Sequence, residues 1–276
     1  MNIDVGNINL TLTEKEEIEK LLKRQNLDIK DDLEQIWYLM DLVWEDLGCD
    51  NKHLNWGKIS KFYSHPLWLL NGLFIEQHTV SMKHRHAISD WIIAKNFKKI
   101  LDYGGGFGTL ARLIAQKKPQ LKIFIYEPHP SDFGLKIIKE FKNIHVINKI
   151  EERYDCLVST SVLEHLPDPL NEFEKMIKCV EINGYLLIAN DFYPVIKCHL
   201  PQTFHLRYSF NLFARMMGLK IVGLLEESPA IIYKKTQEIK PNWGKIRFFE
   251  KLSKTLFPVI EVLKPVLRPI KRTIFK

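Results

Sequence analysis

The sequence predicts a doubly wound α/β fold, with a mostly parallel seven-stranded sheet and an antiparallel hairpin at its C-terminal edge. Apolar strand-like runs alternate with helical stretches from residue 98 onward, which predicts parallel strands joined by right-handed crossovers. A glycine cluster at 104–108 separates the first apolar run from the helix after it. The last two runs, 219–226 and 229–235, have no helix between them, so we expect them to form the hairpin.

Residues 1–82 predict a helical cap or lid on this sheet. Residues 13–25 carry acidic groups early and basic groups late, as a helix dipole favours. Residues 30–47 repeat apolar groups at helical spacing. Residues 51–77 are rich in aromatic and loop-forming residues, which favours a cap over a sheet, and a helix at 83–96 leads into the central domain.

We expect the sheet domain to span residues 83–236 and a basic amphipathic tail to follow at 237–276. Besides the hairpin, the predicted strands are 99–103, 121–126, 144–148, 154–159 and 184–190. The predicted helices between them are 108–117, 131–142, 169–181 and 208–217.

The formal net charge of +7 is concentrated at the C-terminus. Residues 234–276 hold 12 Lys/Arg and 3 Asp/Glu, which leaves 28 basic and 30 acidic residues for the rest. A near-neutral body disfavours a nucleic-acid-binding domain, because such domains carry their basic patch on the fold itself. The basic tail could still act on something anionic.

Composition and cysteine spacing narrow the class further. With 46% hydrophobic and 26% charged residues, the chain is typical of a globular protein. Its four cysteines show neither CxxC pairing nor zinc-site spacing, which favours reduced thiols in a cytoplasmic protein. The polar start, residues 1–10, predicts no signal peptide, and the absence of an 18-residue apolar run predicts no membrane span.

The sharpest motif is ILDYGGGFGTL, residues 100–110. Glycines permit positive φ and let a ligand approach the backbone, and the N–H groups that open the next helix favour an anionic group. Glu127 ends the following strand, where a carboxylate can accept both ribose hydroxyls of an adenosine. A tight turn without a ligand is the alternative. The dinucleotide pattern GxGxxG fails because Thr109 replaces its third glycine, and no Lys-Ser/Thr completes a phosphate-binding P-loop.

This motif resembles the D/E-x-G-x-G-x-G signature of class I S-adenosylmethionine-dependent methyltransferases, with Asp102 at the acidic position. Glu127 also matches that family. Residues 154–169, YDCLVSTSVLEHLPDP, look like its fourth strand and turn, above all in the small-molecule branch with S-x-L-E-H-x-x-D-P. Residues 182–190 look like its next helix-end glycine and fifth strand, so the resemblance covers about 98–235.

The resemblance implies S-adenosylmethionine as the cofactor and assigns residues to it. Asp102 would lie near the cofactor ammonium, Glu127 would bind the ribose, and Pro128 would stack beside the adenine. The glycines that would pack against the methionine part and ribose are Gly104, Gly105, Gly106 and Gly108.

Further cofactor contacts are implied at three places. Asn148 would flank the adenine, and Thr160 and Ser161 would reach the cofactor through backbone atoms. Arg85 lies before the first strand, where the family often reaches the cofactor carboxylate. Arg85 and its neighbours His84 and His86 could equally be surface charges on a helix.

Methyl transfer mainly requires that the acceptor be aligned and lose its proton. A hydroxyl acceptor needs a general base or a metal, whereas an amine needs only to be neutral. His165 follows the fourth strand and could be that base, or a structural histidine that caps the turn with Glu164. Asp191 and Tyr193, just past the fifth strand, are alternative catalytic residues.

A metal site from Asp191, His199 and His205 can be drawn, but its spacing matches no standard ligand set, so no metal is expected. We expect the acceptor to enter between the helical cap and the 191–207 loop. Aromatic residues there could form either core or a pocket for a sugar, a ring-bearing natural product or a lipid head. They are Trp37, Trp44, Trp56, Phe62, Tyr63, Trp68, Phe192, Tyr193 and Phe204.

Residues 245–276 mix apolar groups with Lys and Arg. Pro258, Pro265 and Pro269 predict a helix broken into short pieces. One apolar stripe could contain Phe248, Phe249, Leu252, Leu256, Ile260, Leu263 and Leu267. Such a segment could lie in a membrane interface against anionic headgroups, pack on its own domain or a dimer partner, or contact RNA.

The sequence therefore predicts a methyltransferase that acts on a hydroxyl or amine of a small molecule, glycan or lipid-linked intermediate. We expect no nucleic-acid partner, and a cytoplasmic location with peripheral contact at the inner face of a membrane. The alternative is a non-catalytic module of the same fold, serving as a partner or membrane-attached scaffold. The glycine spacing disfavours a nicotinamide-dependent oxidoreductase.

Overall fold

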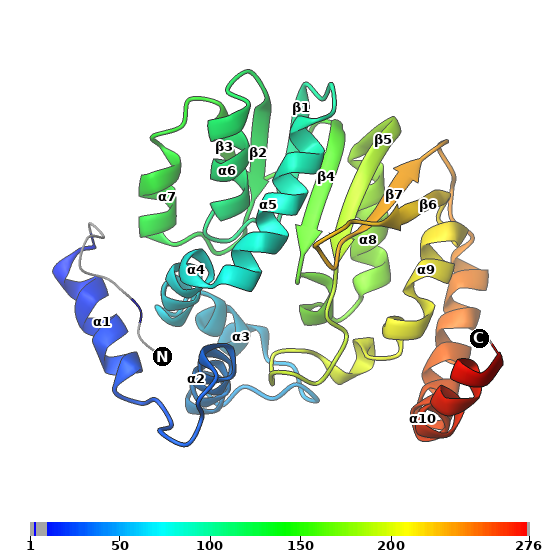
Figure 1. Cartoon of the computed structure of the whole chain (residues 1–276), viewed down its shortest axis with the longest axis horizontal. Coiled ribbons are helices and arrows are strands. Elements are labelled where there is room, and N and C mark those ends of the chain that lie inside the picture. Colours follow the sequence, from blue (N-terminus) through cyan, green and yellow to red (C-terminus); the bar gives the residue numbers. More distant parts are fainter. Residues whose placement is uncertain (1–2, 4–9, 275–276) are drawn as a thin grey trace.

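The computed structural model describes residue 3 and residues 10–274, and beyond residue 264 it describes the backbone alone. A seven-stranded sheet in the order β3-β2-β1-β4-β5-β7-β6 runs through the centre, with helices on both faces (Figure 1). β7 pairs antiparallel with both β5 and β6, and the other neighbours are parallel. The predicted fold class is confirmed.

The strands follow the predicted order. They are β1 (Lys99–Tyr103), β2 (Lys122–Tyr126), β3 (Ile144–Ile147), β4 (Tyr154–Thr160), β5 (Val180–Ala189), β6 (Leu219–Leu224) and β7 (Ile231–Lys235).

The helices fall into an N-terminal group, a group that covers the sheet, and a long C-terminal helix. The first group is α1 (Leu12–Leu22), α2 (Asp32–Asp46), α3 (Trp56–Tyr63) and α4 (Leu67–Gln77). The others are α5 (Thr79–Ile93), α6 (Thr109–Lys117), α7 (Asp132–Ile138), α8 (Pro169–Lys178), α9 (Leu206–Met216) and α10 (Trp243–Ile274).

Local chemistry explains where several helices begin. Thr11 and Glu14 form a capping box at the start of α1. Asp168 caps α8 through Asn171 N–H, and Pro169 occupies the first turn, where its missing N–H costs nothing. The helix predicted at 131–142 is shorter than expected, because the chain must leave α7 and turn before β3 begins.

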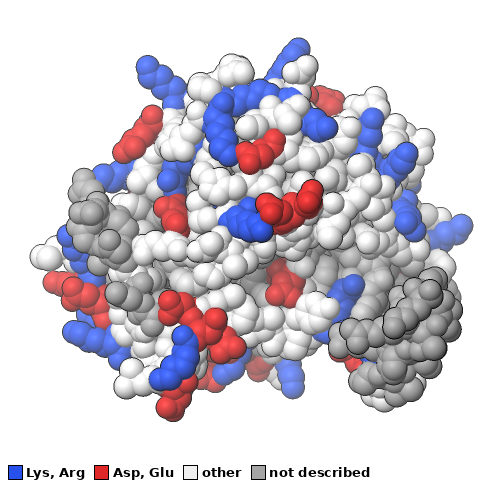
Figure 2. Space-filling view, in the orientation of Figure 1, with Lys and Arg blue, Asp and Glu red and all other residues white. Residues whose placement is uncertain are grey.

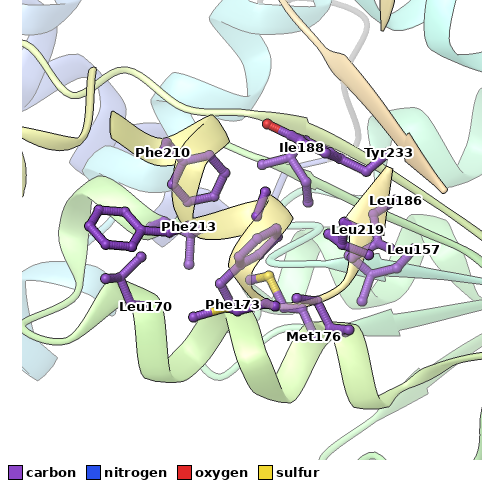
Figure 3. Close-up of a cluster of buried hydrophobic side chains, with 14 of the residues drawn as sticks. Leu157, Leu170, Phe173, Met176, Leu186, Ile188, Phe210, Phe213, Leu219 and Tyr233 are labelled. Carbon is purple, nitrogen blue, oxygen red and sulfur yellow. The ribbon is translucent and has the colours of Figure 1, made fainter. Parts of the chain in front are cut away.

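The sheet separates two apolar cores because successive side chains of a strand point to opposite faces. In β5, Leu186 and Ile188 face the core beneath α8 and α9, whereas Leu187 and Ala189 face the core beneath α5 and α6. Figure 3 shows the first of these cores, where the rings of Phe173 and other residues of α8 and α9 pack against the strands.

A third core lies among the N-terminal helices and includes residues from outside them. Trp44 and Phe62 meet edge to face there, with ring centroids 5.0 Å apart. Phe133 of α7 joins this core, as do Ile196 and Cys198 from the segment between β5 and α9. Several aromatic residues that could have lined a pocket are therefore core residues.

Helix α10 runs continuously from Trp243 to Ile274, so the prediction that its prolines break the helix is wrong. A proline removes the N–H that would bond the carbonyl four residues earlier. Pro258 is exposed, and so is Lys254, whose carbonyl loses that partner; water can therefore satisfy it. The side chains of Pro265 and Pro269, and that of Leu267 in the predicted apolar stripe, lie outside the described residues.

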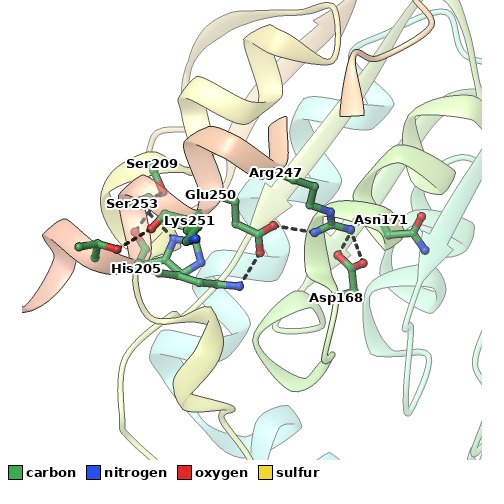
Figure 4. A network of polar contacts seen from close by, with 10 residues as sticks. Asp168, Asn171, His205, Ser209, Arg247, Glu250, Lys251 and Ser253 are labelled. Carbon is green, nitrogen blue, oxygen red and sulfur yellow. Dashed lines mark hydrogen bonds and ion pairs between the residues drawn. The ribbon is translucent and has the colours of Figure 1, made fainter. Parts of the chain in front are cut away.

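One face of α10 packs on the protein itself. Ile246 is fully buried, and Glu250 pairs with Arg247 and Lys254. Figure 4 shows how Arg247 also reaches Asp168 at the start of α8. The inner face of α10 therefore packs on the sheet domain. Within the described residues, no helix is long and apolar enough to cross a bilayer.

Candidate active site

The most favourable place for a ligand is the edge of the sheet where β1 and β4 lie side by side. From β1 the chain continues to β2 and β3 on one side, and from β4 to β5 on the other. In open α/β sheets, ligands bind beyond the carboxyl ends of the strands at this switch point. Figure 1 shows α2, α3 and α4 facing this edge, so the cap and the sheet enclose it between them.

The glycine turn after β1 exposes backbone at one position. Gly104, Gly106 and Gly108 have left-handed φ values of 73°, 51° and 75°. A Cβ on Gly104 would lie 2.4 Å from Val162 Cγ2, and one on Gly108 would lie 2.7 Å from Ile138 Cδ1. A Cβ on Gly106 would meet nothing within 4 Å. The outer two glycines permit tight packing, whereas Gly106 faces open space that a ligand could fill.

Glu127 is fixed beside this turn by two backbone hydrogen bonds. Its Oε2 accepts from Gly106 N–H at 2.9 Å and its Oε1 accepts from His129 N–H at 3.0 Å. The half-buried carboxylate thus lies at the end of β2, next to the open backbone, as a ribose ligand would require.

Asp102 is a carboxyl group that is unfavourable to ionise where it lies. It is buried, and its Oδ2 has no hydrogen-bond partner among the described residues. Burial raises its pKa to about 7, against the lowering effect of the Arg85 charge. Arg85 itself donates to Ser81 O at 3.0 Å and is close enough for its own pKa to respond to Asp102. A carboxylate oxygen without a donor suits a ligand ammonium group.

The other predicted cofactor residues lie along the same edge. Pro128 and Asn148 are exposed after β2 and β3. Thr160 is half-buried at the end of β4, and Ser161 has a left-handed φ of 54° and donates its N–H to Ala189 O at 2.8 Å. That N–H is therefore used within the sheet, which leaves backbone carbonyls for a ligand. Their roles stay predictions. Gly105 packs closely, since a Cβ there would lie 2.9 Å from Asp102 Oδ2.

The predicted catalytic residues separate into two groups. His165 lies in the 3-10 turn after β4, and its Nδ1 is 3.1 Å from Cys198 O. Asp191 is half-buried nearby, and burial raises its pKa. Tyr193 instead turns its exposed ring to Arg207, whose guanidinium lies 4.1 Å from the ring centroid. The part of Tyr193 that lies beside the histidines is its carbonyl oxygen, 2.7 Å from His199 Nδ1.

Glu164 is a candidate site residue that the sequence predicted only as part of a turn cap. Its side chain is fully buried, and Oε1 accepts from Asp191 N–H at 2.9 Å. Its Oε2 is buried without a partner among the described residues, and burial raises the Glu164 pKa to about 7. The sequence signal was present, because Glu164 precedes His165 in the S-x-L-E-H turn, but it indicated only a capping role.

The metal trio that could be drawn from the sequence does not assemble. His205 Nδ1 lies 2.9 Å from Ser253 Oγ of α10, in the polar network of Figure 4. The group that does meet within the described residues is Glu164, His165 and His199, with one ligand atom from each within 4.8 Å of the others. His199 meets Glu164 and His165 because the segment that carries it passes beside the turn after β4.

A second carboxylate, Glu76, joins the cap to the glycine helix and has no recognisable sequence signal. Its Oε1 accepts from Thr109 Oγ1 at 2.7 Å, and it pairs with Arg112. Both partners lie on α6, just after the glycine turn, so the cap is held against the cofactor side of the sheet.

Comparison with known proteins identifies the family. A family model described as a methyltransferase domain matches residues 76–218, about half of the chain. The chain belongs to the class I S-adenosylmethionine-dependent methyltransferase family. The resemblance seen in the sequence is thus confirmed, and so is the assignment of S-adenosylmethionine as the cofactor of the family.

Two curated relatives of this methyltransferase differ in their stated substrates. A Helicobacter pylori protein named ribosomal RNA small subunit methyltransferase G is 31% identical over 99 residues, covering 34% of this chain and 56% of its own. A Photobacterium profundum ubiquinone biosynthesis O-methyltransferase is 26% identical over 148 residues, covering 48% and 61%. The chain thus spans somewhat over half the length of the curated relatives it matches.

A solved structure supports the fold. An O-methyltransferase family protein from Burkholderia thailandensis superposes with a TM-score of 0.55 and 16% identity, covering 74% of this chain and 71% of that one. At that identity the similarity shows the fold alone.

The methyltransferase site fits the cofactor of its family on three structural grounds. Gly106 presents backbone to open space, Glu127 holds a carboxylate beside it, and Asp102 offers an unpartnered buried oxygen. The unpartnered oxygen of Asp102 is unfavourable without a donor such as an ammonium group, and Glu127 beside the open backbone at Gly106 offers an acceptor for hydroxyl groups.

Proposed function

We propose that this methyltransferase transfers the methyl group of S-adenosylmethionine to a hydroxyl or amine of a small molecule, glycan or lipid-linked intermediate. The observation that carries the activity is the open backbone at Gly106, flanked by the carboxylates of Asp102 and Glu127. The cofactor supplies an activated methyl group on its sulfonium. The protein therefore has to hold the cofactor, align the acceptor and remove the proton of the acceptor.

The chain's own residues divide that work. Asp102 Oδ2 would accept from the cofactor ammonium, which removes the cost of its burial. Glu127 would exchange its bond with Gly106 N–H for the two ribose hydroxyls. Pro128 and Asn148 would flank the adenine, and Thr160 and Ser161 would contribute backbone atoms.

The acceptor side would lie between α3 and the turn after β4. The Tyr63 ring stacks with His129 at a centroid distance of 5.9 Å and meets His165 edge to face at 6.0 Å. Rings so arranged favour a flat or ring-bearing acceptor. Burial lowers the pKa of His165 to about 3. An imidazole with so low a pKa is a weak base, so a hydroxyl acceptor would need further help to lose its proton.

A small acceptor is favoured over ribosomal RNA, the substrate named for the Helicobacter pylori relative. Outside residues 234–276 the chain holds 28 basic and 30 acidic residues. Figure 2 shows Lys and Arg interspersed with Asp and Glu over the described part of the face it presents. RNA affinity depends on neutralising many phosphates, which this distribution does not favour.

Calorimetry with S-adenosylhomocysteine tests cofactor binding. We expect the wild type to bind and Gly106→Arg to lose binding, because the arginine would fill the open space. Gly223→Arg is the control for an arginine added at open backbone, since a Cβ there also meets nothing within 4 Å, and the melting temperature of Gly106→Arg measures the strain that its left-handed φ adds. Absence of heat from the wild type, together with an unchanged melting temperature, would refute the proposal.

The acceptor class requires transfer of a labelled methyl group, assayed separately in soluble, lipid, RNA and other polymer fractions of a cell extract. Label in the soluble, glycan or lipid fraction supports the proposal, and label confined to RNA overturns it. Cofactor binding without transfer to any fraction would favour the non-catalytic module.

We also propose that the outer face of α10 contacts an anionic membrane surface, at the inner face of a membrane. Phe248 is 65% exposed, and an apolar stripe continues along the same face. Its other members are Phe249, Leu252, Leu256, Val259, Ile260 and Leu263. Residues 234–276 carry 12 basic and 3 acidic residues, and the excess of basic side chains that are neither buried, as Lys235 is, nor paired, as Arg247 and Lys254 are, would complement anionic headgroups.

A further inference from the structure

Three metal-ligating side chains converge beside the cofactor cleft without serving the cofactor. Glu164 and His165 come from the turn after β4, and His199 comes from the segment between β5 and α9. One oxygen of Glu164 and one nitrogen of each imidazole lie within 4.8 Å of one another. The imidazole centroids are 4.9 Å apart, with their planes 70° from parallel.

Hydrogen bonds to backbone carbonyls determine which imidazole nitrogens are free. His165 Nδ1 lies 3.1 Å from Cys198 O, and His199 Nδ1 lies 2.7 Å from Tyr193 O. A carbonyl can only accept, so each Nδ1 must carry the hydrogen. Each Nε2 of the neutral ring is therefore an acceptor. Backbone carbonyls of this kind commonly orient histidines that bind metals.

Glu164 adds a third acceptor. Its Oε1 is occupied by Asp191 N–H at 2.9 Å, whereas Oε2 is buried without a partner among the described residues. An acceptor that is buried without a donor is unfavourable. A cation held by Glu164 Oε2 and one nitrogen of each imidazole would remove that cost.

We propose that Glu164, His165 and His199 form a binding site for a divalent cation of the Zn²⁺ class. Two imidazoles and one carboxylate are the protein ligands of zinc sites that keep a position open for substrate. Ligands about 2.1 Å from a tetrahedral metal lie about 3.4 Å apart, so the three ligand atoms, which lie within 4.8 Å of one another, have to close by up to roughly 1.4 Å. The carbonyl groups that lie beside each Nδ1 leave Nε2 of both rings as the nitrogen that can bind a metal.

Such a site specifies the acceptor chemistry, and this step rests on the proposed methyl transfer. An acceptor hydroxyl whose oxygen bound the cation would lose its proton more easily, so the cation would supply the help that a hydroxyl acceptor needs. The oxygen then forms its bond to the methyl carbon as the carbon–sulfur bond breaks. S-adenosylhomocysteine leaves, and the hydroxyl proton passes to solvent. The inference therefore favours a hydroxyl acceptor over an amine.

Metal binding by the full-length protein, after treatment with a chelator, tests the site. We expect one equivalent of Zn²⁺ to bind in calorimetry, and Co²⁺ to give the intense visible absorption of a low-coordinate nitrogen–oxygen site. Glu164→Gln and His199→Ala should each weaken Zn²⁺ binding by about tenfold or more, because each removes a ligand. His145→Ala is the control, since His145 is an exposed histidine of β3.

Binding of S-adenosylhomocysteine, measured on the same samples, distinguishes failure of the metal site from failure of the proposed function. Retained cofactor binding by Glu164→Gln and His199→Ala shows that these variants are folded. A wild type that binds the cofactor but not one equivalent of Zn²⁺ overturns the metal site and leaves the proposed function intact. Equal Zn²⁺ affinity in the wild type and both ligand variants overturns it as well.

Discussion

At the scale of single residues, Asp102 on the cofactor side is unfavourable without a ligand. It is buried with an unpartnered oxygen, and burial raises its pKa to about 7 from an ordinary value of 3.8. Binding sites often retain such a cost because the ligand relieves it. Gly106 adopts a left-handed φ of 51°, which costs a glycine little, and it leaves the backbone open for a ligand.

Asp102→Asn should change how stability depends on pH. Because the folded pKa of Asp102 exceeds its unfolded value, the native state holds its proton more tightly. Wild-type stability should therefore fall as the pH rises from about 4 through 7. We expect Asp102→Asn to melt at least a few degrees above the wild type at pH 8, with the difference shrinking at pH 5. Differential scanning calorimetry without cofactor measures both.

The difference in stability between the two proteins reports on Asp102 alone. Burial raises the pKa of Glu164 as well, but Glu164 is present in both proteins and its contribution cancels. The same substitution should weaken binding of S-adenosylhomocysteine, since the neutral amide has no charge to pair with the ammonium. A wild type as stable at pH 8 as Asp102→Asn would contradict the raised pKa.

At the scale of elements, α10 has two faces with different environments. Its inner face packs through Ile246 and through the ion pairs of Glu250 shown in Figure 4, and Glu261 pairs with Arg207 of α9. Its outer face exposes the stripe that begins at Phe248. Docking on the domain and contact with a membrane are therefore compatible, because they use opposite faces.

The membrane proposal predicts that Leu252→Asp with Leu256→Asp weakens sedimentation with anionic phosphatidylglycerol vesicles several-fold. Both side chains are exposed, so the fold should be unaffected. Val222→Asp is the matched control, because Val222 is an exposed apolar residue of β6. Truncation after Thr236 should weaken sedimentation too, and higher salt should reduce wild-type binding. Equal sedimentation of the wild type and the stripe variant would refute membrane contact.

At the scale of the whole molecule, the cap and the sheet domain share apolar packing. The core of the N-terminal helices includes Phe133 of α7 together with Ile196 and Cys198 of the segment after β5. Glu76 of α4 also binds Thr109 and Arg112 of α6. Segments that the sequence divides at residue 82 are thus tied together on both sides of the cofactor edge.

This packing predicts one cooperative thermal transition for the full chain. S-adenosylhomocysteine at a hundred times its dissociation constant should stabilise the folded state by about 2.7 kcal/mol and raise the whole transition by several degrees. Scanning calorimetry provides the measurement. Two transitions, of which the ligand moves only one, would show that the cap unfolds independently.

The sequence by itself determined the succession of strands along the chain, the glycine turn and the positions of Asp102 and Glu127. These features depend on neighbouring residues: apolar alternation defines strands, and glycine alone adopts positive φ cheaply. A tight turn between a buried strand and a helix therefore has a local signature, as does a carboxylate at a strand end.

Only the tertiary structure decided which distant groups meet. His199 joins His165 across 34 residues, and Lys235, counted with the basic tail, is buried and donates to Ile177 O and Val180 O at 2.9 and 2.8 Å. The helix through Pro258 likewise persists because its freed carbonyl faces water. Such outcomes depend on how separate segments pack and on where solvent reaches, and neither is encoded in the spacing of neighbouring residues.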